Sequence, residues 1–238
     1  MKNYVVWTNC TIDEKEKRFN IEAGADNSVR EAYNRMWQIS RNSARKFLQG
    51  DWEEIVWTDT QPSRGELFKL NWKRVKELWH QEPCNILYLD ADTIFIRPTE
   101  VFDKFFEFRM FNCADPKTEY EFLNYYNAAV RYYPWTMKSE TWQVGQNAAD
   151  HWSLDLYDYE QIVFNRMYWS QHISMHDRHW PKLNWQAVVS DHEDLLQYQN
   201  QWNNCSIGEA HIIHAHGSRG AKQSLEMMEP LAQMLDII

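Results

Sequence analysis

The segment Asn85-Ile86-Leu87-Tyr88-Leu89-Asp90-Ala91-Asp92-Thr93 runs from four apolar residues directly into two carboxylates that are one residue apart. A continuous apolar run of this length is typical of a strand buried on both faces, as in a parallel sheet. Asp90 and Asp92 then stand where the strand leaves the sheet, at the edge where open α/β sheets bind ligands. Two hard oxygen ligands there suit Mn²⁺ or Mg²⁺, with phosphate oxygens completing the coordination shell.

An Asp-x-Asp motif by itself is more often a pair of solvated turn carboxylates, but the buried strand in front of it fixes both side chains at a sheet edge. Two enzyme classes share this signature. In GT-A glycosyltransferases it holds a metal on the donor diphosphate. In haloacid-dehalogenase-type phosphatases it supplies a nucleophile and an acid/base, and it ends the first strand of the domain. Here α/β structure is expected before Asp90, so glycosyl transfer is the leading interpretation and the phosphatase is the alternative.

Strands and helices alternate over the first hundred residues. Apolar runs predict strands at residues 4–8, 54–58 and 85–89, followed by a short strand at 93–96 that Pro98 stops. Ser-x-x-Glu capping signatures at Ser28 and Ser63 predict a helix in each gap. The second helix carries an apolar stripe of Leu67, Leu70, Val75, Leu78 and Trp79. This β-α-β-α-β order predicts an α/β fold with a doubly wound, mostly parallel sheet.

Composition is that of a soluble enzyme with one domain. The chain has 238 residues and a mean hydropathy of -0.70, with no apolar run long enough to cross a membrane. The N-terminus has no signal-peptide pattern, so we expect a cytoplasmic protein. In that compartment the cysteines are expected to be free thiols, since none forms a CxxC pair: Cys10, Cys84, Cys113 and Cys205.

The net charge of -9 disfavours tight binding to a nucleic-acid backbone, which needs clustered Lys and Arg. Aromatic residues are abundant, with 13 Trp, 12 Tyr and 11 Phe. Most of these rings are expected in the core, and rings also stack well on sugar faces.

The second half of the chain carries three further signals. The run 126–130 is strand-like and contains Asn127. Asn127 is either a site residue or a structural residue that hydrogen-bonds a loop. Residues 158–165 resemble a helix start, with Asp158 and Glu160 in a first turn that favours acidic side chains whether or not they have a catalytic role. The run 212–217 is a short apolar strand that ends in His214 and His216.

Taken together, these segments resemble the metal-dependent, retaining GT-A glycosyltransferases of the glycogenin and lipopolysaccharide-galactosyltransferase type. The galactosyl/xylosyltransferases are a second, similar group. The matching segments are 87–93 with the Asp-x-Asp, Phe68-Lys69-Leu70, Asn127-Ala128-Ala129-Val130, Glu160-Gln161, and His214 three residues before Gly217. The chain departs from the family pattern in three places: Ala129 replaces the usual Gly, Gly220 stands where a Lys is expected, with Lys222 two residues later, and the Lys-Pro-Trp ending is absent.

The resemblance implies a role for each matched residue. The metal, Mn²⁺ or Mg²⁺, would be held by Asp90, Asp92 and His214, with His216 as second choice. A nucleoside-diphosphate sugar would be bound by Thr8 and Asn9 near the base and by Lys69, Asp90, Ala91, Asp92, Asn127, Gly217 and Lys222. Glu160 or Gln161 would lie beneath the sugar ring, with Asp158 as a weaker candidate. The expected activity is hexosyl transfer with retention of configuration.

The same resemblance implies one GT-A domain over 1–238, with a nucleotide-sugar-binding half at 1–100 and an acceptor half at 101–238. The acceptor stays open among a glycan, a lipid-linked sugar, a protein side chain and a modified nucleic-acid base. Residues 172–185 form either an acceptor-side loop or a structural one. Apolar residues at helical spacing favour a docking helix at the C-terminus over a membrane-surface helix: Leu225, Met228, Leu231, Leu235 and Ile238. A catalytically inactive sugar-nucleotide-binding relative is a further alternative.

Overall fold

The structure is a computed structural model that describes residues 1–12, 27–61, 64–102, 109–112, 126–137, 186–189, 211–215 and 220–238. Its helices are α1 (Asn27–Phe47), α2 (Arg64–Gln81), the short 3-10 helix η1 (Trp135–Met137) and α6 (Ala221–Met234). Its strands are β1 (Lys2–Ile12), β2 (Glu53–Gln61), β3 (Cys84–Leu89), β4 (Thr93–Phe95), β5 (Arg109–Asn112), β6 (Tyr126–Tyr133), β7 (Gln186–Val189) and β8 (Ile212–Ala215).

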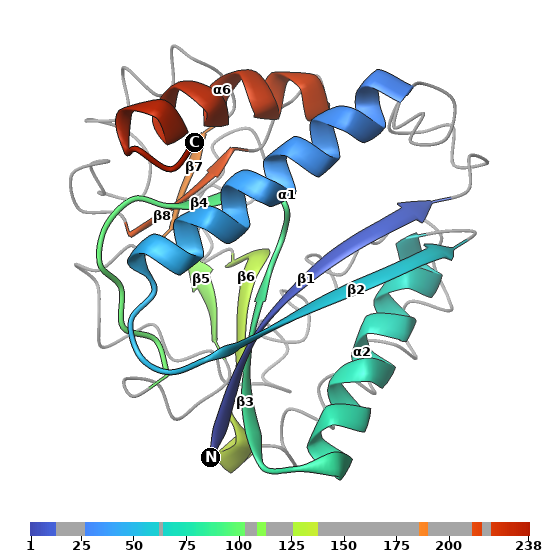
Figure 1. The fold of residues 1–238 in the computed structure, drawn as a ribbon. Coiled ribbons are helices and arrows are strands. Elements are labelled where there is room, and N and C mark those ends of the chain that lie inside the picture. The colour runs from blue at the N-terminus through green and yellow to red at the C-terminus, as the bar shows by residue number, and fades with distance from the viewer. Residues whose placement is uncertain are drawn as a thin grey trace.

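The larger sheet has the strand order β2-β1-β3-β6-β5 (Figure 1). β1 pairs in parallel with both β2 and β3, as the β-α-β-α-β pattern predicts. β6 pairs antiparallel with β3 and β5, so β6 runs against the other four strands of this sheet. The fold is therefore a mixed α/β fold with a mostly parallel sheet, and the predicted fold class is confirmed.

A smaller sheet with the order β4-β8-β7 lies beyond the end of β3. The short strand predicted after the Asp-x-Asp is confirmed as β4, which pairs antiparallel with β8. Thr93 lies opposite His214 in this register. Because β4 follows β3 directly, this pairing brings a C-terminal strand to the edge of the main sheet where the two carboxylates stand.

Both faces are buried in β3 and in residues 4–7 of β1, which explains the continuous apolar sequence there. Alternate residues of a strand point to opposite faces. Even-numbered residues such as Tyr4 and Ile86 pack in the cluster that contains the α2 side chains, whereas odd-numbered Trp7 and Leu87 pack in the cluster of α1. Figure 1 shows α1 and α2 on opposite sides of the sheet.

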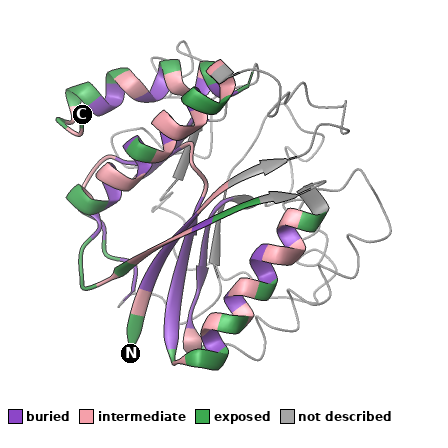
Figure 2. Ribbon diagram, turned by 45° about the vertical axis from the view of Figure 1, so that its right-hand side comes forward, coloured by how far each residue is buried: buried purple, intermediate pink, exposed green. Residues whose placement is uncertain are grey.

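The buried face of α2 agrees with the predicted stripe at Val75 and Trp79 and differs from it in the first half of the helix. Phe68, Trp72, Val75 and Trp79 are buried against the sheet, whereas Leu67 and Leu70 are only half-buried (Figure 2). The correct face carries the larger rings, which bury more apolar area than a leucine does. Trp72 and Trp79 meet edge to face, with ring centroids 6.1 Å apart.

The starts of the two helices test the capping signatures. α1 already includes Asn27, so Ser28 lies inside the helix and the prediction that it caps the helix is wrong. Ser28 is the second residue of α1, so the signature locates the start of the helix to within two residues but does not mark its cap. α2 begins at Arg64, directly after the predicted cap Ser63, which lies outside the described residues.

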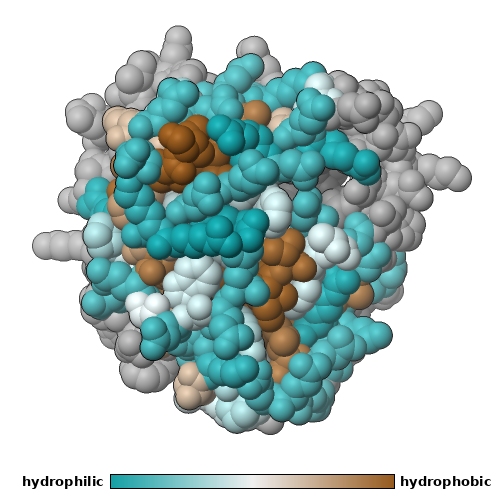
Figure 3. Space-filling view, viewed as in Figure 1, coloured by the Kyte–Doolittle hydropathy of each residue, from teal (hydrophilic) through white to brown (hydrophobic). Residues whose placement is uncertain are grey.

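The C-terminal helix α6 docks on the domain as predicted. It lies beside α1 in Figures 1 and 2, and Met227, Met228 and Leu231 are buried in one cluster with Met36 and Ile39 of α1. Leu225 and Leu235 are partly buried, but Ile238 is 40% exposed and does not belong to the docking face. Figure 3 shows that the surface over α1 is mostly hydrophilic and is flanked by smaller hydrophobic patches.

Two features of the chain's chemistry are settled here. Cys84 is a free, buried cysteine, and burial raises the pKa of its thiol to about 12, so the thiol stays protonated. The side chain of Cys10, and Cys113 and Cys205 altogether, lie outside the described residues. In the described part of the chain, no helix combines the length and the apolar character that a membrane crossing requires.

Candidate active site

The Asp-x-Asp forms a tight turn between β3 and β4, and hydrogen bonds to β6, to Thr93 and to β8 hold its backbone. The Asp90 amide donates to the Ala129 carbonyl of β6 at 2.8 Å. The Thr93 amide and hydroxyl both donate to the Asp90 carbonyl, at 3.3 and 2.7 Å. The Ala215 amide of β8 donates to the Asp92 carbonyl at 2.9 Å. The backbone that carries the two carboxylates is therefore fixed by both sheets.

Two buried serine hydroxyls of α1 form hydrogen bonds with the residues that follow this turn. The Thr93 hydroxyl donates its one hydrogen to the Asp90 carbonyl. The Ser40 hydroxyl, 3.2 Å away, is therefore the donor in its hydrogen bond with Thr93. Ser40 in turn accepts from the Trp7 indole N–H at 2.9 Å. One turn of helix further on, the Ser43 hydroxyl accepts from the Phe95 amide at 3.0 Å. Thr93 therefore stabilises the turn through both its amide and its hydroxyl.

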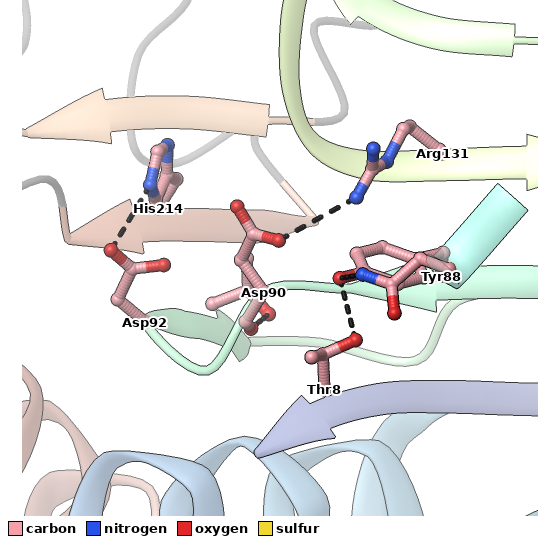
Figure 4. A network of polar contacts seen from close by, with 8 residues as sticks. Thr8, Tyr88, Asp90, Asp92, Arg131 and His214 are labelled. Carbon is pink, nitrogen blue, oxygen red and sulfur yellow. Dashed lines mark hydrogen bonds and ion pairs between the residues drawn. The ribbon is translucent and has the colours of Figure 1, made fainter. Parts of the chain in front are cut away.

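His214 reaches Asp92 from β8. Its Nε2 lies 3.3 Å from Asp92 Oδ2, and the imidazole is buried (Figure 4). Burial alone lowers the pKa of this imidazole, but the charge of Asp92, its hydrogen bond and the charge of Asp90 together outweigh burial, so the pKa is raised above its ordinary value. Two residues that are far apart in the sequence thus meet at the turn.

Asp90 faces a different partner. Its Oδ1 lies 3.8 Å from Nη2 of Arg131, whose side chain is only 2% exposed (Figure 4). Arg131 lies opposite Tyr88 in the β3–β6 register, and its guanidinium sits 3.9 Å above the Tyr88 ring centroid. Asp90 is two residues beyond Tyr88, so both point to the face of the sheet on which Arg131 lies.

Sequence reasoning missed Arg131, although a signal was present. It stands inside the apolar run Ala128-Ala129-Val130-Arg131-Tyr132-Tyr133, which reads as a buried strand. Arginine is almost never fully buried unless it is paired, so an arginine in such a run indicates a buried carboxylate partner or a ligand.

The predicted nucleotide-side residues, Thr8 and Asn9, lie inside β1, which extends to Ile12 and so runs beyond the predicted strand 4–8. The Tyr88 hydroxyl donates to the Thr8 hydroxyl at 2.7 Å and accepts from the Asn71 amide of α2 at 3.1 Å. The Asn9 amide donates to Asn34 of α1 at 3.3 Å. Thr8 is thus connected through Tyr88 to the strand that carries the Asp-x-Asp.

The other predicted residues lie in several different elements. Lys69 is half-buried on α2 and pairs with Glu66 at 3.1 Å. Lys222 is exposed in the first turn of α6. The backbone of Asn127 lies in β6, paired with Phe111, and its side chain is not described. Ala91 is half-buried in the turn. The remaining predicted residues lie outside the described residues: Asp158, Glu160, Gln161, His216 and Gly217.

The donor set suits the expected cation. Carboxylate oxygens and an imidazole nitrogen are ligands that Mn²⁺ accepts, and Mg²⁺ favours the carboxylates. Across the described ranges, no three His, Cys, Asp or Glu side chains already converge as a metal site. Asp92 and His214 are in contact, while Asp90 faces Arg131.

No protein-family model matches the chain, and no curated protein matches its sequence. Several solved structures are similar to this chain in fold. One is a glycosyltransferase involved in the glycosylation of the major capsid of PBCV-1, with a TM-score of 0.52 and 12% identity over 97% of this chain and 100% of that one. The fold is that of GT-A glycosyltransferases. The second is the apo form of the bifunctional glycosyltransferase WbbM, with a TM-score of 0.57 and 8% identity over 99% of this chain.

The chain covers 51% of WbbM, so it spans about half the length of that protein. At these identities the similarity establishes the fold alone. The predicted GT-A fold is therefore confirmed, whereas reaction, donor and metal have to be argued from the site.

Proposed function

We propose that this protein is a glycosyltransferase that uses a nucleoside-diphosphate sugar and a divalent cation. The observation that supports the proposal best is the Asp-x-Asp turn beside His214, with Asp92 Oδ2 and His214 Nε2 3.3 Å apart, in a GT-A fold. Carboxylates at the carboxyl edge of a sheet are where a diphosphate-bound cation is expected. The phosphatase alternative draws no comparable support, because the matching structures above are glycosyltransferases.

Asp90, Asp92 and His214 are the residues that we propose as ligands of Mn²⁺ or Mg²⁺. The cation, when bound, supplies Lewis-acid neutralisation of the charge on the departing diphosphate. The chain's own contribution is rigidity: the backbone hydrogen bonds of the turn hold Asp92 against His214 before any ligand arrives. A site held in place loses less entropy when it binds its ligand.

The remaining roles complete the proposal. Thr8 and Asn9 lie near the base. The donor is lined by four further residues: Ala91, Asn127, Gly217 and Lys222. Lys69 supplies a second positive charge to the diphosphate after leaving Glu66. Glu160 or Gln161 lies beneath the sugar ring, with Asp158 as the weaker candidate, and hexosyl transfer proceeds with retention.

One domain, 1–238, carries the donor half at 1–100 and the acceptor half at 101–238. The acceptor is a glycan, a lipid-linked sugar, a protein side chain or a modified base.

A thermal-shift screen tests this function. We expect at least one nucleoside diphosphate, among UDP, GDP and ADP, to raise the Tm with Mn²⁺ by roughly 5–10 °C at about a hundred times its Kd. With EDTA the shift should shrink or vanish. A screen in which no nucleotide shifts the Tm contradicts the proposal. Trapping of beryllium fluoride on Asp90 would favour the phosphatase instead, because it mimics a phosphoryl group on a nucleophilic aspartate.

The two histidines give a second prediction. His214→Ala should raise the Mn²⁺ concentration required for turnover by about tenfold or more, because it removes a neutral imidazole from the ligand set. His216→Ala should have the smaller effect. A Mn²⁺ titration of both variants decides between them: if only His216→Ala shifts the requirement, the ligand is the second histidine.

The pH dependence of metal binding provides the matching control. Mn²⁺ and a proton compete for the same imidazole. Since the carboxylates raise the pKa of His214 above about 6.5, the Mn²⁺ affinity of the wild type should already fall as the pH drops through values above 6.5. The His214→Ala variant should lose this dependence while keeping the one that belongs to its carboxylates at lower pH. Calorimetry across pH 5.5–8.5 compares the two.

A further inference from the structure

Arg131 brings a permanent positive charge next to one of the two site carboxylates. Its side chain is 2% exposed, and the neighbouring Asp90 side chain is 40% exposed. A guanidinium does not lose its proton in proteins, so burial cannot neutralise it as it would a lysine. The face of the Tyr88 ring, 3.9 Å from the guanidinium carbon, holds the group in place.

This charge affects the two ligands of the site in opposite ways. A bare divalent cation at Asp90 must share that carboxylate with Arg131 and is repelled by the guanidinium. A diphosphate that arrives with the cation brings the negative charge that offsets both. In a partly buried site such charges interact more strongly than they would in bulk water.

Building on the function proposed above, we propose that Arg131 is a positioning residue that engages Asp90 and makes the site bind a divalent cation tightly only together with an anionic diphosphate. Asp92 and His214, which are in contact with each other, would be the first ligands of the cation. Asp90, 40% exposed, pairs with Arg131 and would become a ligand of the cation only when the diphosphate is also bound.

Calorimetry of Mn²⁺ binding, with and without saturating UDP, tests this in wild type, Arg131→Met and Arg131→Lys. The methionine variant removes the charge and keeps an apolar side chain on the Tyr88 ring. It should bind bare Mn²⁺ at least about tenfold more tightly than wild type and should show a smaller gain from UDP. The lysine variant carries a charge that burial can remove, so its bare-Mn²⁺ affinity should lie between those of wild type and Arg131→Met.

Arg74 offers a matched control. It also stacks on an aromatic ring, Trp57, at 5.7 Å and pairs with a carboxylate, Asp59, at 3.2 Å. Arg74→Met should leave the bare-Mn²⁺ affinity unchanged. In the double variant Arg131→Met/Asp90→Asn, the gain in bare-Mn²⁺ affinity should disappear, because Arg131 acts through the Asp90 charge.

If Arg131→Met does not fold by circular dichroism, Asp90→Asn decides the question. It should weaken Mn²⁺ binding in the presence of UDP and leave bare-Mn²⁺ affinity within about threefold of wild type, because Asp90 is engaged with Arg131 in the free protein. Equal losses with and without UDP would overturn the proposal, as would an Arg131→Met variant that binds bare Mn²⁺ no better than wild type. Wild type that binds Mn²⁺ in neither condition would overturn the proposed function itself.

Discussion

Asp92→Asn is expected to lower Mn²⁺-dependent turnover of a sugar nucleotide by at least about a hundredfold, while the fold stays intact. Asparagine has nearly the same shape as aspartate but carries no charge. The variant therefore loses a hard anionic ligand and the attraction to His214, whose Nε2 lies 3.3 Å away. The Asp92 backbone carbonyl still accepts from Ala215, so the pairing of the turn with β8 is kept.

Two measurements make this result interpretable. Calorimetry of UDP with Mn²⁺ should show weaker binding in parallel with the loss of turnover, because the cation links the carboxylate to the diphosphate. Asp236→Asn is the matched control, since the Asp236 side chain is 99% exposed and lies at the C-terminus. It should behave as wild type. Equal activity of Asp92→Asn and wild type would remove Asp92 from the site.

The second large effect concerns stability. Leu87→Ala should lower the free energy of unfolding by about 3 kcal/mol, because it empties space at a position that cannot easily collapse. Leu87 is 0% exposed and lies in β3 between Val5 of β1 and Tyr132 of β6. For a chain of this size, about 3 kcal/mol corresponds to a fall in Tm of roughly 6–12 °C.

Urea denaturation of Leu87→Ala beside Leu70→Ala measures this effect. The control removes the same atoms from a half-buried position on α2 and should cost clearly less. A cost below about 1 kcal/mol for Leu87→Ala would mean that β3 is not the central strand of the packed sheet.

How much the sequence can predict differs between the strands and the helices. The strands β1 and β3 were predictable because their apolar runs are unbroken and are buried on both faces. The edge strand β2 was predictable from the short apolar run Ile55-Val56-Trp57, although only Trp57 of its described side chains is buried. The burial of α2 was harder, because Leu67 and Leu70 fit a helical stripe as well as the buried Phe68 and Trp72 do. Which stripe faces inward depends on the sheet that the helix meets, and a helix period does not specify that sheet.

The candidate site divides in the same way. Asp90 and Asp92 were recognisable because both stand directly after a buried strand. Spacing alone could not choose between His214 and His216, since residues two apart in an extended strand share a face. What places His214 is the register of β8 on β4, which sets it opposite Thr93 and within reach of Asp92.

The sequence by itself thus determined the β-α-β-α-β order and the position of the two carboxylates, because both follow from local patterns of apolar and charged residues. Only the tertiary structure decided that Asp92 meets His214 and that Asp90 meets Arg131. The physical reason is that strand pairing is non-local: β6 and β8 come from the second half of the chain, and their registers are fixed by packing against β3 and β4.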